Sequence, residues 1–316
     1  MPTPQTRRAK KRAARRRNPK RYGFRRVCIF LLALVATELA WRTGAFAHTS
    51  HVHARTVAAG HHRVSQALTV HPAARLVTGS PLAPPTTAPQ EAQTALDRMI
   101  SLGYPVCRGA GTKPLVALTF DDGPGPYTQQ TVDTLKAAGA RATFFIVAKE
   151  LVGWPQLADE PAVEATVGAL GDHTYDHIGL VGLTQANLDH EMGDAQALIE
   201  QHDGGAPVKL FRPPYGQHDS AVDAEARGLG MLEVLWTVDS GDGLAGATAS
   251  TVLQNVESHL APGAIVLMHE NRGTTQRILP DLLNYIRSKG LKTVTVPELM
   301  AEDPPSIGQL KAQHCG

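Results

Sequence analysis

The sequence predicts an α/β domain of parallel strands covered by helices, and two observations indicate it. From residue 115 onward, short apolar runs alternate with stretches of helical periodicity, as in strand–helix–strand units. Polar residues able to do chemistry fall at or just after the ends of these runs, where parallel barrels build their sites. Hydrophobic residues make up 42% of the 316, enough for a core of its own. The alternation fits either an α/β barrel or a doubly wound sheet.

The expected elements follow from apolar spacing along the chain. A first helix over 91–102 is indicated by Ala95, Leu96, Met99 and Ile100, which recur at helical intervals. Strands are expected at the apolar runs 115–120, 142–147, 209–211, 232–238 and 264–268. Further helices are expected over 128–138, 185–202, 220–229, 249–260 and 276–289. The sequence shows no repeat of domain-building length, so the elements form one unit rather than a solenoid.

The N-terminus predicts export. Residues 1–26 carry twelve of the 31 Lys and Arg and no acid, so the rest of the chain has 19 basic against 29 acidic residues. The apolar run 27–37 is shorter than the about 20 residues of a membrane span, and Ala45-Phe46-Ala47 suits signal cleavage. We therefore expect residues 1–47 to be a signal peptide, or alternatively an uncleaved anchor that attaches the protein to the membrane. We expect the body to be secreted or held at the outer face of the cytoplasmic membrane. A basic tail next to a membrane-type segment, on an acidic body, argues against nucleic acid as the main partner.

A linker and a pair of cysteines complete the domain plan. Residues 48–90 are rich in His, Pro and Thr and are expected to form an extended stalk, which leaves 91–316 as the domain that carries the candidate site residues described below. Cys28 lies within the export segment, so Cys107 and Cys315 remain in the domain. In an oxidising compartment they could join the two ends of the domain, or they could be two free thiols, and spacing alone leaves both open.

Two adjacent carboxylates are the first candidate site residues. The run Thr119-Phe-Asp-Asp-Gly-Pro ends an expected strand on Asp121 and Asp122. Neighbouring carboxylates can divide labour, since one can bind a metal while the other remains a general base. The plain alternative is a pair that caps the following helix.

Two histidines extend this site. His173 and His177 are four residues apart, a spacing that places both imidazoles on one face of a helical turn. Together with Asp122 they would form a set of two histidines and one carboxylate that leaves positions open for water and substrate. Such a set suits catalytic zinc or a related divalent ion.

Two more strand ends carry polar residues. Arg212-Pro-Pro-Tyr-Gly216 follows an expected strand, and its prolines fix the backbone around Arg212 and Tyr215. An arginine there can orient a carboxylate. His269 ends the apolar run 264–268 and, if it faces the metal, can donate a proton to a leaving group.

Five motifs in this order resemble those of the polysaccharide deacetylases, the NodB-homology domain of carbohydrate esterase family four. The resemblance covers residues 115–300 and implies a distorted (β/α) barrel that removes acetyl groups from an N-acetylated sugar polymer with a divalent metal. The motifs are Thr119-Phe-Asp-Asp-Gly-Pro, His173-x-x-x-His177, Arg212-Pro-Pro-Tyr-Gly216, Asp239-x-x-Asp242 and Leu267-x-His269.

The resemblance also implies roles for individual residues. Asp121 would be the general base, and the metal ligands would be Asp122, His173 and His177. Arg212 would position Asp121, while the Tyr215 amide would bind the oxyanion and Leu267 would line the acetyl pocket. His269 would be the general acid, with its pKa adjusted by Asp242, although Asp239 could serve instead.

One departure from the family pattern concerns the substrate. The fourth motif usually ends in Asp-Trp, whereas Gly243 follows Asp242 here, and Trp154 is a possible replacement for the missing aromatic wall. We expect a zinc-dependent N-deacetylase of cell-wall peptidoglycan, with chitin-like polymers and acetylated xylan left open. The alternative from another class is a non-catalytic glycan-binding or wall-anchoring module that keeps the fold.

Overall fold

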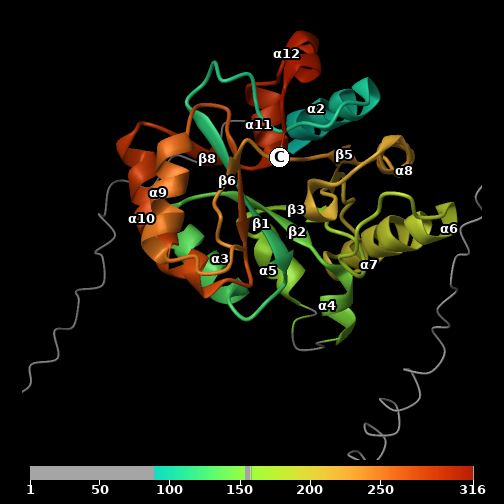
Figure 1. Cartoon of the computed structure of the whole chain (residues 1–316), viewed down its shortest axis with the longest axis horizontal. Coiled ribbons are helices and arrows are strands. Elements are labelled where there is room, and N and C mark those ends of the chain that lie inside the picture. Colours follow the sequence, from blue (N-terminus) through green and yellow to red (C-terminus); the bar gives the residue numbers. More distant parts are fainter. Residues whose placement is uncertain (1–88, 154–156, 158, 316) are drawn as a thin grey trace, which may run out of the picture. The chain divides into compact units, whose positions relative to one another are not determined.

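The structure is a computed structural model that describes residues 89–315 apart from 154–156 and 158 (Figure 1). The chain divides into two units, Met1–Thr69 and Val70–Gly316, and all described residues belong to the second. The expected signal or anchor over 1–47 and nearly all of the stalk over 48–90 lie outside them. Among the helices of the described residues, none is long and apolar enough to cross a membrane.

Parallel strands form one sheet in the order β5-β4-β3-β2-β1-β7-β6, with β8 also paired to β1. The segment before β1 pairs with two further places in the sheet region, since Val106 pairs with Val234 just after the edge strand β5 and Arg108 pairs with Ala264 just before β7. The result is an open, distorted barrel, which confirms the predicted α/β class. The strands are β1 Leu115–Gly123, β2 Ala142–Ile146, β3 Gly168–Asp172, β4 Leu210–Phe211, β5 Leu232–Glu233, β6 Val238–Asp239, β7 Ile265–His269 and β8 Lys292–Val294.

Helices surround these strands, and α2 packs on α11 (Figure 1). The expected helix over 185–202 is interrupted by a π-helical segment, η2, in which the backbone hydrogen bonds join residues five apart instead of four. The helices are α2 Pro89–Leu102, α3 Thr128–Ala138, α4 Ala148–Gly153, α5 Glu160–Ala165, α6 Gln185–Leu188, η2 Asp189–Asp194, α7 Ala195–His202, the 3₁₀ turn η3 Pro214–Gly216, α8 Ser220–Gly228, α9 Ala249–His259, α10 Gly273–Ser288, α11 Val296–Glu302 and α12 Ile307–Ala312.

Both faces of β1 are buried, and each face packs in a different apolar cluster. Val116, Leu118 and Phe120 belong to one apolar cluster with residues of the surrounding helices. Leu115 and Ala117 belong to a second cluster that the other faces of the strands share with α2 and α11. Because side chains alternate along a strand, Thr119 and Asp121 continue the inner face begun by Leu115 and Ala117. The strand therefore delivers Asp121 to the interior of the barrel at its carboxyl end.

Several strand predictions need correction. The run 232–238 is not one strand but β5 and β6, because residues 234–237 bend between the two edges of the sheet. The strand β3 was missed, since its sequence Gly-Ala-Leu-Gly-Asp has little β-propensity and an added Cβ at Gly171 would come within 2.6 Å of the Phe145 ring. The three-residue strand β8 was also missed because it is too short to show a period. Tertiary packing, and not local preference, makes these segments extended.

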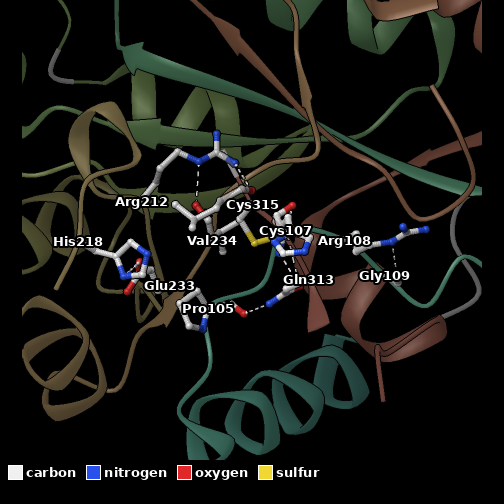
Figure 2. Close-up of a disulfide and its surroundings, with 12 residues drawn as sticks. Pro105, Cys107, Arg108, Gly109, Arg212, His218, Glu233, Val234, Gln313 and Cys315 are labelled. Carbon is white, nitrogen blue, oxygen red and sulfur yellow. Dashed lines mark hydrogen bonds and ion pairs between the residues drawn. A yellow bond between two sulfur atoms is a disulfide. The ribbon is translucent and has the colours of Figure 1, made fainter. Parts of the chain in front are cut away.

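Cys107 and Cys315 form a disulfide, which decides between the two alternatives that spacing left open (Figure 2). Their Cα atoms are 5.6 Å apart across 208 positions of sequence. The adjoining Gln313 side chain donates a hydrogen bond to the Pro105 carbonyl at 2.5 Å. The bridge thus joins the segment after α12 to the segment that precedes β1.

Removing this bridge by Cys107→Ala with Cys315→Ala is expected to lower the free energy of unfolding by about 2–4 kcal/mol, because a long loop is released in the unfolded chain. Denaturant unfolding measures the effect. Ser258→Ala, at an exposed position of α9 away from the bridge, is the control, so equal unfolding midpoints for all three proteins would contradict the prediction.

Candidate active site

Asp121 is held by a buried arginine at the carboxyl end of the strands. Arg212 follows β4, is fully buried, and donates from Nη1 to Asp121 Oδ1 at 2.6 Å and to Thr119 Oγ1 at 2.8 Å. Its guanidinium lies 4.1 Å from the centre of the Phe145 ring, and Nε donates to the Val234 carbonyl at 3.0 Å. These contacts fix one oxygen of Asp121 and leave Oδ2 facing His173 Nε2 at 3.5 Å.

A break in the strand register brings Asp122 to the same site. In a regular strand, Asp122 would point away from Asp121, but the pairing of β1 with β2 shifts between Phe120 and Gly123 and Asp122 has φ 65. Aspartate tolerates this left-handed conformation better than most residues. The irregularity re-aims the side chain, as β-bulges commonly do, so that Asp122 Oδ1 lies 3.3 Å from His177 Nε2.

The two histidines meet, but not on a helix. The predicted helical turn is wrong, because residues 173–177 form an irregular loop after β3 in which Thr174 has φ 71 and His177 has φ 57. The Thr174 hydroxyl accepts the His177 N–H at 3.0 Å and closes this loop. The centres of the two imidazole rings are 4.8 Å apart, so a tight loop brings the histidines together as was expected of a helical turn.

Asp122, His173 and His177 fit a divalent cation. Each offers one ligand atom, and these atoms lie within 4.8 Å of one another. The Nδ1 of His173 donates to the Arg212 carbonyl at 2.7 Å, which leaves the Nε2 lone pair for a metal. Burial and then the His173 ring lower the pKa of His177, which keeps that imidazole neutral. Asp122 Oδ1 is buried without a hydrogen-bond donor, as expected for an oxygen that a cation completes.

Across the site, His269 is paired with Asp242 and not with Asp239. His269 ends β7 in register with Asp121, and its Nδ1 donates to Asp242 Oδ1 at 2.7 Å. Burial opposes the charged imidazolium, but the hydrogen bond and charge of Asp242 outweigh it and raise the pKa of His269 to about 9. Asp239 instead accepts the N–H of Gly241 in a local turn. His269 is therefore protonated at neutral pH.

The remaining two predicted residues occupy different environments. Tyr215 is exposed, has φ 61, and packs its ring edge-on at 5.0 Å from that of His177. Its amide lies in the first turn of η3, where N–H groups lack a partner within the helix. Leu267 is buried in the inner apolar cluster with Leu235 and Trp236. The structure thus places a hydrogen-bond donor, the Tyr215 amide, at the exposed side of the site and an apolar side chain, Leu267, in its buried part.

The family model described as polysaccharide deacetylase matches residues 108–234, which contain Asp121, the candidate metal ligands and the buried Arg212. A peptidoglycan-N-acetylglucosamine deacetylase of Bacillus cereus is 32% identical over 196 residues, which cover 60% of this chain and 70% of that protein. The chain belongs to the polysaccharide deacetylase family. It is a hydrolase that acts on carbon–nitrogen bonds other than peptide bonds.

Solved structures of this family share the deacetylase fold. The Bc1960 peptidoglycan N-acetylglucosamine deacetylase is 28% identical with a TM-score of 0.57, covering 63% of this chain and 94% of that chain. A CE4 family pseudoenzyme from Bacillus anthracis is 27% identical with a TM-score of 0.58, covering 64% of this chain and 70% of that chain. The fold alone therefore does not distinguish an active deacetylase from an inactive one, and the site residues must.

Three residues that position the deacetylase site were missed from the sequence. Asn271 donates to Asp122 Oδ2 at 3.3 Å, and Thr275 donates to Asp242 Oδ2. Trp236 packs beneath the turn that carries Tyr215, since an added Cβ at Gly216 would lie 2.9 Å from its ring. Asn271 and Thr275 follow His269 closely, and this proximity was the only sequence signal for them. Trp236 fell inside a run interpreted as a strand.

A cavity of about 550 Å³ opens beside the candidate metal ligands of the deacetylase, and its lining includes Asp122, His177, Lys149 and Asn271. On the other side of the site, Gly243 leaves room next to His269, because an added Cβ would be 3.4 Å from His269 Cε1. An aromatic side chain at position 243 would stand against this ring. Trp154, the suggested replacement, lies outside the described residues.

Proposed function

We propose that this polysaccharide deacetylase is metal-dependent and removes the N-acetyl group from N-acetylglucosamine units of peptidoglycan at the outer side of the cytoplasmic membrane. The observation that carries the proposal is the arrangement of Asp122, His173 and His177 between Asp121, held by Arg212, and His269, held by Asp242. The donor set suits zinc. The expected export segment supports the location.

The residues of the site can divide amide hydrolysis among themselves. When bound, the cation would polarise the acetyl carbonyl and lower the pKa of a water molecule. Asp121 takes a proton from the water as the oxygen of the water attacks the acetyl carbonyl carbon. Arg212 holds the Asp121 carboxylate in position. The Tyr215 amide donates to the oxyanion, a contact worth about 3 kcal/mol in comparable sites.

His269 completes the reaction on the opposite side. The amide nitrogen must gain a proton as the carbon–nitrogen bond breaks, and His269 is protonated at neutral pH because Asp242 raises its pKa to about 9. The products are acetate and a free amine on the sugar. Leu267 and the neighbouring apolar side chains offer a surface for the acetyl methyl group.

Peptidoglycan is favoured as the substrate for two reasons. The Bacillus cereus relative carries the name of a peptidoglycan-N-acetylglucosamine deacetylase. Gly243 places no side chain next to His269, where an aromatic residue would stand, and this space suits a glycan that bears peptide side chains. A non-catalytic glycan-binding module is not favoured, since Asp121, Arg212 and His269 are present and in contact with their partners.

The purified protein with zinc is expected to release acetate from peptidoglycan, and mass spectrometry of muropeptides would show acetyl replaced by hydrogen on the glucosamine. Chitin and xylan oligomers in parallel reactions compare the substrate classes. Loss of the acetyl group from muramic acid alone would contradict the assignment of the sugar. Absence of acetate release from peptidoglycan, chitin and xylan oligomers alike would contradict the activity.

A further inference from the structure

A second group of side chains with ligand atoms for a metal lies outside the active site. His218 precedes α8, Asp223 lies in its first turn, and Glu233 ends β5. Their ligand atoms lie within 4.8 Å of one another. The Nδ1 of His218 is 2.7 Å from Asp223 Oδ1 and 3.2 Å from Glu233 Oε1, and Figure 2 shows the imidazole turned toward Glu233.

Glu233 is the unusual member of this group. The residue is 5% exposed, and neither of its carboxylate oxygens has a hydrogen-bond donor. A buried carboxylate without donors costs free energy unless a charge compensates it. Burial first, and then the charge of Asp223, raise the pKa of Glu233 to about 9. The group therefore needs either a proton held among its three side chains or a cation.

A small cavity adjoins both carboxylates. Its volume is about 20 Å³, enough for a single water molecule, and Asp223 and Glu233 are part of its lining. Arg227 also lines it, but the ion pairs of the described residues do not join its guanidinium to either carboxylate. Among the described residues, a third cluster of possible ligands differs, because Glu191 there accepts the Asp176 N–H while Asp176 and His190 are exposed.

We propose that His218, Asp223 and Glu233 bind a second divalent cation, with zinc preferred. One imidazole nitrogen and two carboxylate oxygens are a zinc donor set, and the cavity has room for a water as fourth ligand. Ligand atoms around a tetrahedral zinc stand roughly 3.3 Å apart. The separation of 3.2 Å between His218 and Glu233 already matches this value, whereas the 2.7 Å between His218 and Asp223 must open.

This cation would steady two segments of the active site without touching the substrate. Glu233 directly precedes Val234, whose carbonyl accepts the Arg212 Nε at 3.0 Å (Figure 2). His218 lies three residues after Tyr215. The cation would therefore join the start of α8 to the strand edge that supports Arg212. Its three ligands are positioning residues for the deacetylase reaction.

The test counts zinc in a protein whose active-site ligand has been removed. Asp122→Ala protein is stripped with chelator, dialysed against zinc and analysed for bound metal, beside the same protein with Glu233→Gln added. We expect Asp122→Ala to retain one zinc equivalent that Asp122→Ala/Glu233→Gln loses, together with the rise in unfolding midpoint that zinc produces. Because both proteins carry the same histidine-rich stalk, adventitious binding there cancels.

Each outcome decides the proposal. Equal zinc content in the two proteins would overturn it and assign a proton held among the three side chains. The control Asp122→Ala/Glu257→Gln alters a glutamate on α9 and should keep the zinc. His218→Ala in the Asp122→Ala background provides a second variant if Glu233→Gln disturbs folding, which circular dichroism monitors. Failure of the active site to bind metal would leave this comparison intact, since the active-site ligand is already absent from every protein compared.

Discussion

Asp121→Asn protein is expected to keep its active-site metal and to lose at least about 10²-fold in kcat on an N-acetylglucosamine oligomer. The asparagine amide cannot take a proton from water. Its oxygen can still accept the hydrogen bond that Arg212 Nη1 donates to Asp121 Oδ1 at 2.6 Å in the parent protein. The fold should therefore be preserved. Acetate release and elemental analysis of the same preparation measure the two quantities.

The adjacent carboxylate should behave differently. Asp122→Ala removes the buried oxygen that lies 3.3 Å from His177 Nε2 and is expected to reduce both active-site metal affinity and activity. Asp281→Asn, on the exposed side of α10, is a control that should change neither. If Asp121→Asn lost the metal while Asp122→Ala retained it, the assignment of base and ligand would have to be exchanged.

The order of strands and helices could largely be predicted from the sequence because long apolar runs have a clear period. The expected helix over 128–138 is α3 with the same bounds, and the run 115–120 is extended only by the residues of the site. Periodicity fails where tertiary contacts decide the conformation. In β3, Gly171 is required by the Phe145 ring and Gly168 by the Ala142 carbonyl, and the short β8 is set by pairing with β1.

For the site, the residue types could be predicted but the backbone that brings them together could not. The spacing of His173 and His177 suggested a helix, whereas left-handed residues at Thr174 and His177 form a tight loop. Likewise, a regular strand would have turned Asp122 away from Asp121. Positive φ at non-glycine residues leaves no sequence pattern, so these local departures appear only in the structure.

The choice between Asp239 and Asp242 illustrates the same limit and leads to the second large prediction. Only Asp242 reaches His269, where it accepts from Nδ1 and from the backbone N–H, both at 2.7 Å. Although burial alone would raise the pKa of Asp242, the hydrogen bonds from His269 and Thr275 lower it, so the pair is ionic. The charge on Asp242 therefore keeps His269 protonated.

Asp242→Asn is expected to move the alkaline limb of the kcat/KM profile to lower pH. A general acid works while protonated, so activity of the parent protein should persist up to the His269 pKa of about 9 and fall above it. Without the carboxylate, that pKa should return to about 6.5 or lower, because burial disfavours the imidazolium. At about pH 8 the protonated fraction, and with it the rate, should fall about 30-fold.

A comparison with His269→Gln separates this effect from a structural one. His269→Gln should have low activity and no alkaline limb of this origin, so adding Asp242→Asn to it should cause little further loss, whereas independent structural damage would multiply. Zinc content should be unchanged throughout, since neither residue belongs to the candidate ligand set of Asp122, His173 and His177. An alkaline limb that stays near pH 9 in Asp242→Asn would show that a group other than His269 donates the proton.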